Sequence, residues 1–244
     1  MTDSDRQLLS PKTHHSKPDA ALIAYSSNHW LRAMVQAVPY VGGSIDTLLA
    51  GAGEKLESER VQDFLEKLDE ELNRLTTRPS TLPSEELYDL TITIIEKITR
   101  TRSAGKRKRF AILMARQIQR NVRWDESEVV ARLLGEMTDL HILVLNEAAA
   151  APVCKKPFAG LQAFQLLQHN RQSLSEIVTL TTRLPDSDPQ HLQLVCAELV
   201  GRGLLHDEGV GRLDTSAMEI FVLTDFGRWF LDWISEASYI NSPK

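Results

Sequence analysis

Apolar residues recur at intervals of three and four along most of the chain, which is the spacing of one buried face of an α-helix. The first run predicts a helix over residues 21–38, which breaks at a PYVGG stretch in residues 39–43. Ser44 then caps a longer helix, which extends to about residue 75. Its later apolar positions alternate at four and three, as in helices with an antiparallel partner. These positions are Val61, Leu65, Leu68, Leu72 and Leu75.

The helical pattern continues through three more stretches. Prolines interrupt the chain at residues 79–83, and Ser84 begins the next helix. Ser103 is expected to cap the helix that follows the one beginning at Ser84. Asp125 and Glu128 form a capping box ahead of one long amphipathic helix, which ends in a run of alanines. We therefore predict a helical hairpin or bundle.

A different pattern follows a domain boundary that we place between residues 146 and 158. Apolar residues at three-residue intervals predict a short helix that begins at Phe158 and includes Leu161, Phe164 and Leu167. Ser173 and Glu176 then form a capping box for a second helix.

The stretch from residue 188 to residue 234 combines a helix, a hairpin and an aromatic helix. Asp188 followed by Pro189 begins the first helix, and two glycines end it. A strand, a glycine-containing turn and a strand rich in β-branched and aromatic residues come next. Thr224 caps the last helix, whose apolar side must pack on another element. That side consists of Phe226, Trp229, Phe230, Trp233 and Ile234.

This order of helix, turn, helix, hairpin and helix resembles the winged-helix modules, over about a quarter of the chain. The expected fold class is therefore mainly α, with a helical domain over residues 21–150 and a winged-helix-like domain with a small β-hairpin over residues 158–244. Residues 1–20 are polar and contain two prolines, so we expect a disordered arm there. A shared fold does not by itself supply a function.

The N-terminal hairpin resembles a segment of uncharacterised bacterial proteins, through VPYVGGSIDTLL and the later ERVQDFLEKLDEEL. That resemblance implies no activity. Residues 21–52 carry few charges and a Gly-Gly hinge, so two interpretations remain: a buried hairpin in a helical bundle, or an element of residues 30–52 that binds a membrane or a partner.

Composition is that of an ordinary soluble protein, with 25% charged residues and a net charge of −5 among 244 residues. The two cysteines, Cys154 and Cys196, have no metal or redox spacing, which favours a reducing, intracellular compartment, here the bacterial cytoplasm. We find no signal peptide and no apolar run long enough to cross a membrane.

Nine basic residues and no acid occupy residues 100–123, the most one-sided charge run in the chain. This run is a candidate face for phosphates, nucleic acid, an anionic membrane or an acidic partner. We expect Arg109, Arg116, Arg120 and Arg123 to point outward. The alternative is a solvated face balanced by the acid-rich helix of residues 54–71. The candidate anion-binding residues are Lys106, Arg107, Arg109, Arg116, Arg120 and Arg123.

The helix that begins at Pro189 occupies the position of a recognition helix. Its candidate contact residues are Gln190, His191, Gln193 and Arg202. It holds no lysine or arginine between residues 188 and 200, and phosphate contacts dominate affinity for DNA. Contact with another protein or with a second copy is therefore the favoured use.

No catalytic or nucleotide-binding motif occurs, and His141 is expected to be a hydrogen-bonded core residue rather than a metal ligand. We predict a non-enzymatic interaction or regulatory protein, with no cofactor, metal or small-molecule ligand and with a protein or itself as partner. The alternatives are a DNA-binding transcriptional regulator and a membrane-associated helical effector.

Overall fold

The computed structural model describes residues 52–74, 85–120, 124–154, 160–167, 177–210 and 216–236. Several sequence predictions lie outside these residues. They are the disordered arm, the first hairpin helix and its Gly-Gly hinge, the start at Phe158, and the capping box of Ser173 and Glu176.

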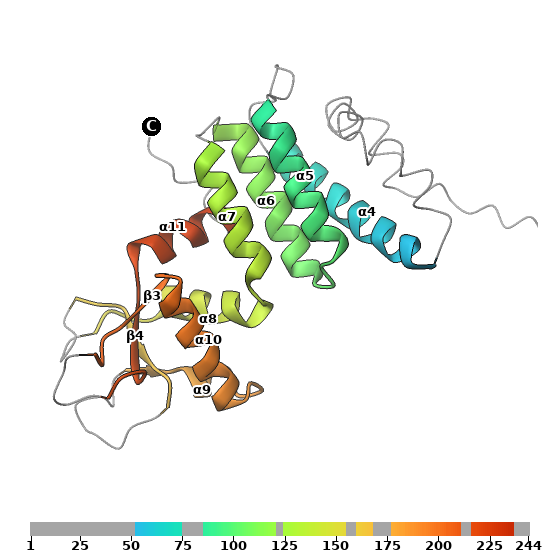
Figure 1. Ribbon diagram of the computed structural model, residues 1–244. Coiled ribbons are helices and arrows are strands. Elements are labelled where there is room, and N and C mark those ends of the chain that lie inside the picture. Colours follow the sequence, from blue (N-terminus) through green and yellow to red (C-terminus); the bar gives the residue numbers. More distant parts are fainter. Residues whose placement is uncertain are drawn as a thin grey trace, which may run out of the picture.

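Four helices pack side by side as a layer (Figure 1). They are α4 (Ala52–Asn73), α5 (Glu85–Thr99), α6 (Ala104–Arg120) and α7 (Trp124–Glu136). The prediction of a helix starting near Ser84 is confirmed by α5. Ser103 caps α6 as predicted, since its Oγ accepts a hydrogen bond from the Lys106 amide at 3.0 Å. The apolar face of α4 turns toward α6, where Phe64 and Leu68 are buried.

The prediction of one long helix after Asp125 is wrong. The structure has two helices, α7 and α8 (Asp139–Ala150), and Asp125 lies within the first turn of α7. Thr138 is in an extended conformation, φ −91° and ψ 169°, and forms a capping box with His141. The apolar spacing hides this break because both helices bury residues in the same core.

A four-stranded sheet lies beyond α8, with strand order β2-β1-β4-β3. The strands are β1 (Ala163–Gln165), β2 (Val178–Thr179), β3 (Leu205–Asp207) and β4 (Ile220–Leu223). β4 is antiparallel to both of its neighbours, and β1 is parallel to β2. Phe164 of β1 pairs with Phe221 of β4, and their stacked rings have centroids 5.5 Å apart.

The predictions of two helices are wrong at this sheet, where the structure has strands. Leu161, Phe164 and Leu167 have helical spacing, but residues 163–165 form β1 and are all buried. The helix expected after the capping box of Ser173 and Glu176 is also wrong at its start, because residues 178–179 form β2 and only the short helix α9 (Leu180–Arg183) follows. Pairing with β4, which is distant in sequence, outweighs the local period here.

The elements after residue 188 match the sequence prediction closely. The first is α10 (Pro189–Gly201), where Asp188 caps the helix by accepting from the His191 amide at 2.9 Å. The last is α11 (Asp225–Ile234), where Thr224 accepts from the Gly227 amide at 2.9 Å. The sequence predicts a strand from Met218 to Leu223, but β4 starts at Ile220, because Met218 adopts a turn conformation with φ 66°. Asp207 holds that turn by accepting hydrogen bonds from the amides of Gly209 and Met218.

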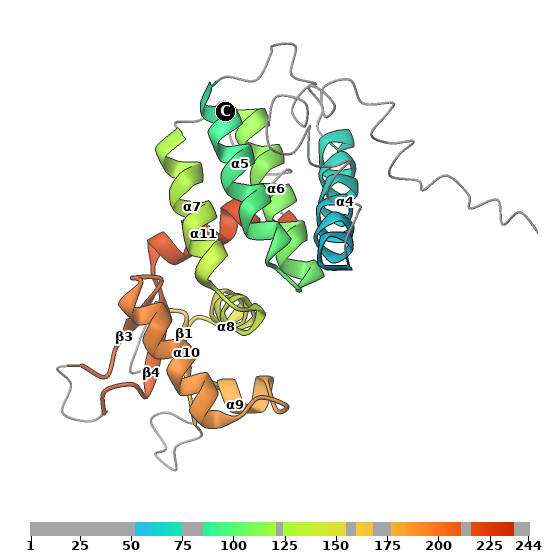
Figure 2. The same cartoon turned by 45° about the vertical axis from the view of Figure 1, so that its right-hand side comes forward.

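One hydrophobic cluster joins the helical layer to the elements around the sheet. Helix α8 ends inside the predicted boundary region of residues 146–158, and it packs on α10, β4 and α11. The domain boundary itself stays a prediction. Figure 2 shows α11 crossing from the sheet to the layer, where it contacts α6. The molecule is mainly helical with a small sheet near its C-terminal end. Within the described ranges, none of the helices has the length and hydropathy required to span a bilayer.

Candidate functional site

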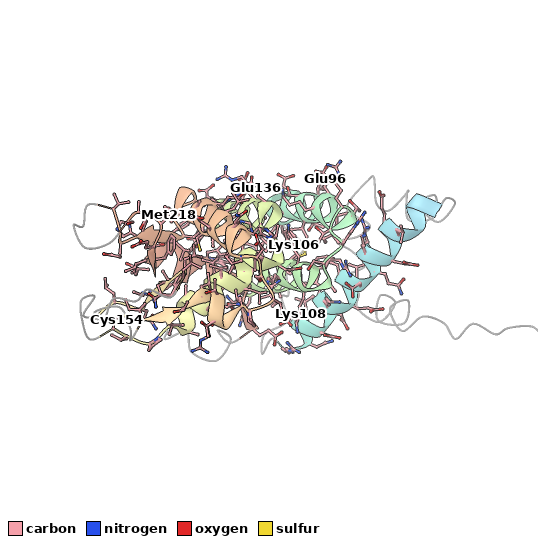
Figure 3. All side chains as sticks on the ribbon, turned by 90° about the horizontal axis from the view of Figure 1, so that it is seen from below. Glu96, Lys106, Lys108, Glu136, Cys154 and Met218 are labelled. Atoms are coloured by element: carbon pink, nitrogen blue, oxygen red, sulfur yellow. The ribbon has the colours of Figure 1, made fainter. Side chains whose placement is uncertain are left out.

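The basic residues of α6 are the first candidate site, and Lys106 turns toward a neighbouring helix. Its Nζ donates hydrogen bonds to the carbonyl oxygens of Gly135 and Met137, each at 2.7 Å. These carbonyls lie at the C-terminal end of α7, where a cation is favoured. Burial lowers the pKa of Lys106, and in Figure 3 its label lies near the centre of the molecule. Lys106 therefore joins α6 to α7.

Arg107 and Arg109 also join elements. Arg107 forms an ion pair with Asp63 of α4 and donates from Nη1 to the carbonyls of Thr101 and Arg102, each at 3.0 Å. Arg109 Nη1 lies 3.2 Å from Asp139 Oδ1, at the start of α8. Asp63 belongs to the acid-rich helix of residues 54–71. Its ion pair with Arg107 is therefore a contact expected from the interpretation in which that helix balances the charge of the basic run.

The predicted outward orientation of Arg116 is wrong. Its side chain is only 1% exposed and lies between α6 and the end of α11. There it donates a hydrogen bond to the Ser235 carbonyl and faces Asp232 at 3.9 Å. The cause is that α4, α5, α7 and α11 surround the second half of α6, which leaves no solvent face at this position. Arg116 is thus unavailable to an external anion.

Two other predicted members of the basic face are not placed. Arg120 ends α6, but its side chain lies outside the described residues, as does Arg123 altogether. Lys108 forms an ion pair with Glu236, beyond the end of α11. Five basic residues of the run therefore make contacts within the chain rather than one open cationic face. They are Lys106, Arg107, Lys108, Arg109 and Arg116.

The exposed side of α10 is the second candidate site. Gln190, His191 and Gln193 are exposed, as a recognition helix requires. Arg202, the predicted cation of the set, instead turns to the side, where Nη1 lies 3.3 Å from Glu198 and Nη2 lies 3.8 Å from Glu136. The outward side of α10 is therefore nearly uncharged.

Leu194 also belongs to this surface, although it is not among the residues predicted from the sequence. Its side chain is 56% exposed in the middle of α10. The signal was present in the sequence, because the buried positions Leu192, Val195, Cys196 and Leu199 form one stripe and residue 194 falls off it. A large apolar residue on the solvent side of an amphipathic helix suggests a contact with another molecule.

The third candidate is a polar network around His141. The amide of Thr138 donates to Nδ1 at 3.1 Å, so Nδ1 is unprotonated and Nε2 donates to Glu198 at 2.8 Å. Burial lowers the pKa of His141, although Glu198 opposes this effect. The prediction of a buried, hydrogen-bonded histidine is confirmed. Within the described part of the chain, no group of three or more histidine, cysteine, aspartate or glutamate residues is placed to hold a metal ion.

No family model, no curated protein and no solved structure matches the chain.

Proposed function

We propose that this chain is a non-enzymatic interaction protein whose C-terminal winged-helix-like unit associates with a second copy through the exposed side of α10. The chain order α9, α10, β3, β4 and α11 supports the winged-helix part of this proposal, because a helix pair is followed by an antiparallel hairpin and a closing helix. Strand β1 extends that hairpin on the β4 side.

The observation that carries the proposal is the chemistry of the α10 surface. Gln190, Gln193, Leu194, Ala197 and Gly201 are exposed and carry no charge. A DNA-reading helix requires cations near the phosphates, whereas Arg202 is engaged with two carboxylates. A protein surface can accept glutamines around an apolar residue, since interface cores are depleted in charge.

A second copy is the partner that this chemistry fits best. In a twofold dimer the same surface faces itself, so a charged residue near the twofold axis would lie close to its own copy and repel it. The uncharged α10 surface avoids that repulsion. Antiparallel packing of two α10 helices would also place the helix dipoles in opposite directions, which is favourable.

Sedimentation velocity over a wide concentration range tests this proposal. We expect the wild-type protein to dimerise and Leu194→Glu to remain monomeric, because the substitution places two carboxylates in the interface. Leu143→Glu is the matched control, since Leu143 of α8 is also exposed at 45% but lies on another helix. A monomeric wild-type protein, or a dimer that tolerates Leu194→Glu, would contradict the proposal.

A DNA-binding regulator is the second candidate function. It is favoured by the exposure of Gln190, His191 and Gln193 in the first turns of α10, since a recognition helix contacts bases through its N-terminal residues. Glutamine can pair with adenine through two hydrogen bonds. Anisotropy titration of a labelled duplex library would support this function only if binding is lost in Gln190→Ala/Gln193→Ala and retained in Leu194→Glu.

A further inference from the structure

An open pocket lies where α4 meets the turn between α5 and α6. Its volume is about 210 Å³, and it is lined by Leu56, Glu59, Arg60, Arg102 and Arg107. The three arginines come from three different segments: α4, the α5–α6 turn and the first turn of α6. We propose that this pocket binds a phosphoanion, which is the phosphate group of a small molecule or of a lipid headgroup.

Two of the guanidinium groups are already fixed in position. Arg60 donates a hydrogen bond from Nη1 to the Thr99 carbonyl at the end of α5. Arg107 is fixed by Asp63 and by the carbonyls of Thr101 and Arg102, and its side chain is only 11% exposed. Each guanidinium carries five N–H donors, so these contacts leave donors for a ligand. A fixed guanidinium loses little entropy when it binds an oxyanion.

Arg102 differs from the other two because it is exposed. Its side chain makes no hydrogen bond or ion pair with the residues that the structure describes. It can therefore turn onto a ligand without breaking an internal contact. Planar guanidinium groups bind phosphate oxygens through paired hydrogen bonds, which favours a phosphoanion over a simple halide.

The charge balance of the pocket also favours an anion. Three cations line it against one acid, Glu59. Asp63 forms ion pairs with Arg107 and Lys67 and none with Arg60 or Arg102 among the described residues, so it does not neutralise those two cations. Leu56 is 54% exposed at the same pocket and offers an apolar contact for the remainder of the ligand.

This site differs from the basic face expected from the sequence. Of the predicted residues only Arg107 lines the pocket, whereas Lys106 and Arg109 turn to α7 and α8. Arg60 lies 42 positions before Arg102 in the numbering, within the acid-rich helix, so sequence proximity could not reveal it. The site also lies on α4 and the α5–α6 turn rather than on α10, so its test is independent of the dimer proposal.

Isothermal titration with inorganic pyrophosphate tests the inference through three substitutions. Arg102→Gln should weaken binding by about tenfold or more, because a charge-assisted hydrogen bond is removed. Glu59→Gln should strengthen binding several-fold, since a repelling carboxylate is lost. Arg132→Gln on α7 is the matched control: Arg132 is exposed outside the pocket, and the same charge is removed. Circular dichroism melting should show that all three variants remain folded.

The source of the phosphate is resolved by a second arm with vesicles that contain phosphatidic acid. Binding to pyrophosphate in solution supports a soluble ligand, and binding to the vesicles alone supports a headgroup, provided that the order of the three variants holds in each case. The inference is overturned by no binding in either arm. It is also overturned if Arg102→Gln and Arg132→Gln weaken binding equally, since net charge alone would then account for the affinity.

Discussion

The ring of His141 satisfies one backbone amide at the start of its own helix and one carboxylate of another helix. It accepts from the Thr138 amide at the start of α8 and donates to Glu198 on α10. Protonation of Nδ1 would place a donor against the Thr138 amide, which is also a donor. The neutral ring is therefore the form that fits the folded state, in agreement with the lowered pKa of His141 that burial causes.

Stability should consequently fall as the pH falls from about 7 toward about 5. Burial holds the folded-state pKa of His141 below its ordinary value of 6.5, so the unfolded chain binds more protons in this window and gains relative stability. Glu198 takes up its proton below this pH window, because the hydrogen bond from His141 lowers the pKa of Glu198 below 4.5. The other charged groups that act on the ring are Arg202 and His191, both in the α10 region.

Urea unfolding at a series of pH values measures this effect. His141→Gln retains an acceptor for the Thr138 amide but does not titrate, so its stability should depend less on pH than that of the wild-type protein. His206→Gln removes a histidine whose side chain is 65% exposed and should keep the wild-type slope. An unchanged slope in His141→Gln would show that His141 is not the group responsible.

Elements with signals at their own ends were predictable, and elements that depend on distant partners were not. Asp188 and Thr224 cap α10 and α11 as the sequence indicates, since a cap involves residues three positions apart. Strand β1 was predicted as a helix because its identity depends on β4, more than fifty residues later in the numbering. The candidate sites divide in the same way: exposure along α10 follows from helical period, whereas the partners of Arg107 and Arg116 follow from tertiary packing.

Gly227 is the point at which α11 approaches the start of β3. A Cβ placed there would lie 2.3 Å from the Leu204 carbonyl oxygen and 2.6 Å from Leu223 Cδ1. Gly227→Ala should therefore destabilise the protein by roughly 1–3 kcal/mol in urea unfolding, because backbone must move. Gly201→Ala is the matched control, since a Cβ there meets nothing within 4 Å, and it should stabilise α10 by up to about 1 kcal/mol. Equal stabilities of the two variants would contradict the close approach of α11.

At the scale of the whole molecule, buried residues connect the helical layer to the sheet region. The cluster extends from Phe64 of α4 through Leu145 of α8 to Trp233 of α11. Helix α8 belongs by sequence to the first predicted domain and packs on elements of the second. We therefore expect the two regions to unfold together, although the sequence pattern predicts two domains.

Arg116 offers the sharpest test of that expectation, because it links α6 to the residue that follows α11. Arg116→Ala leaves the Ser235 carbonyl without this donor and opens a cavity beside it, so we expect a loss of about 3 kcal/mol or more. Hydrogen exchange measured by mass spectrometry should then be faster in peptides of α5 and in peptides of β4. The two increases should be similar, because both elements would exchange only through unfolding of the whole protein. Arg132→Ala removes an exposed arginine and should change neither set. Faster exchange confined to α11 and β4 would instead mean that the helical layer unfolds independently, as two separate domains would.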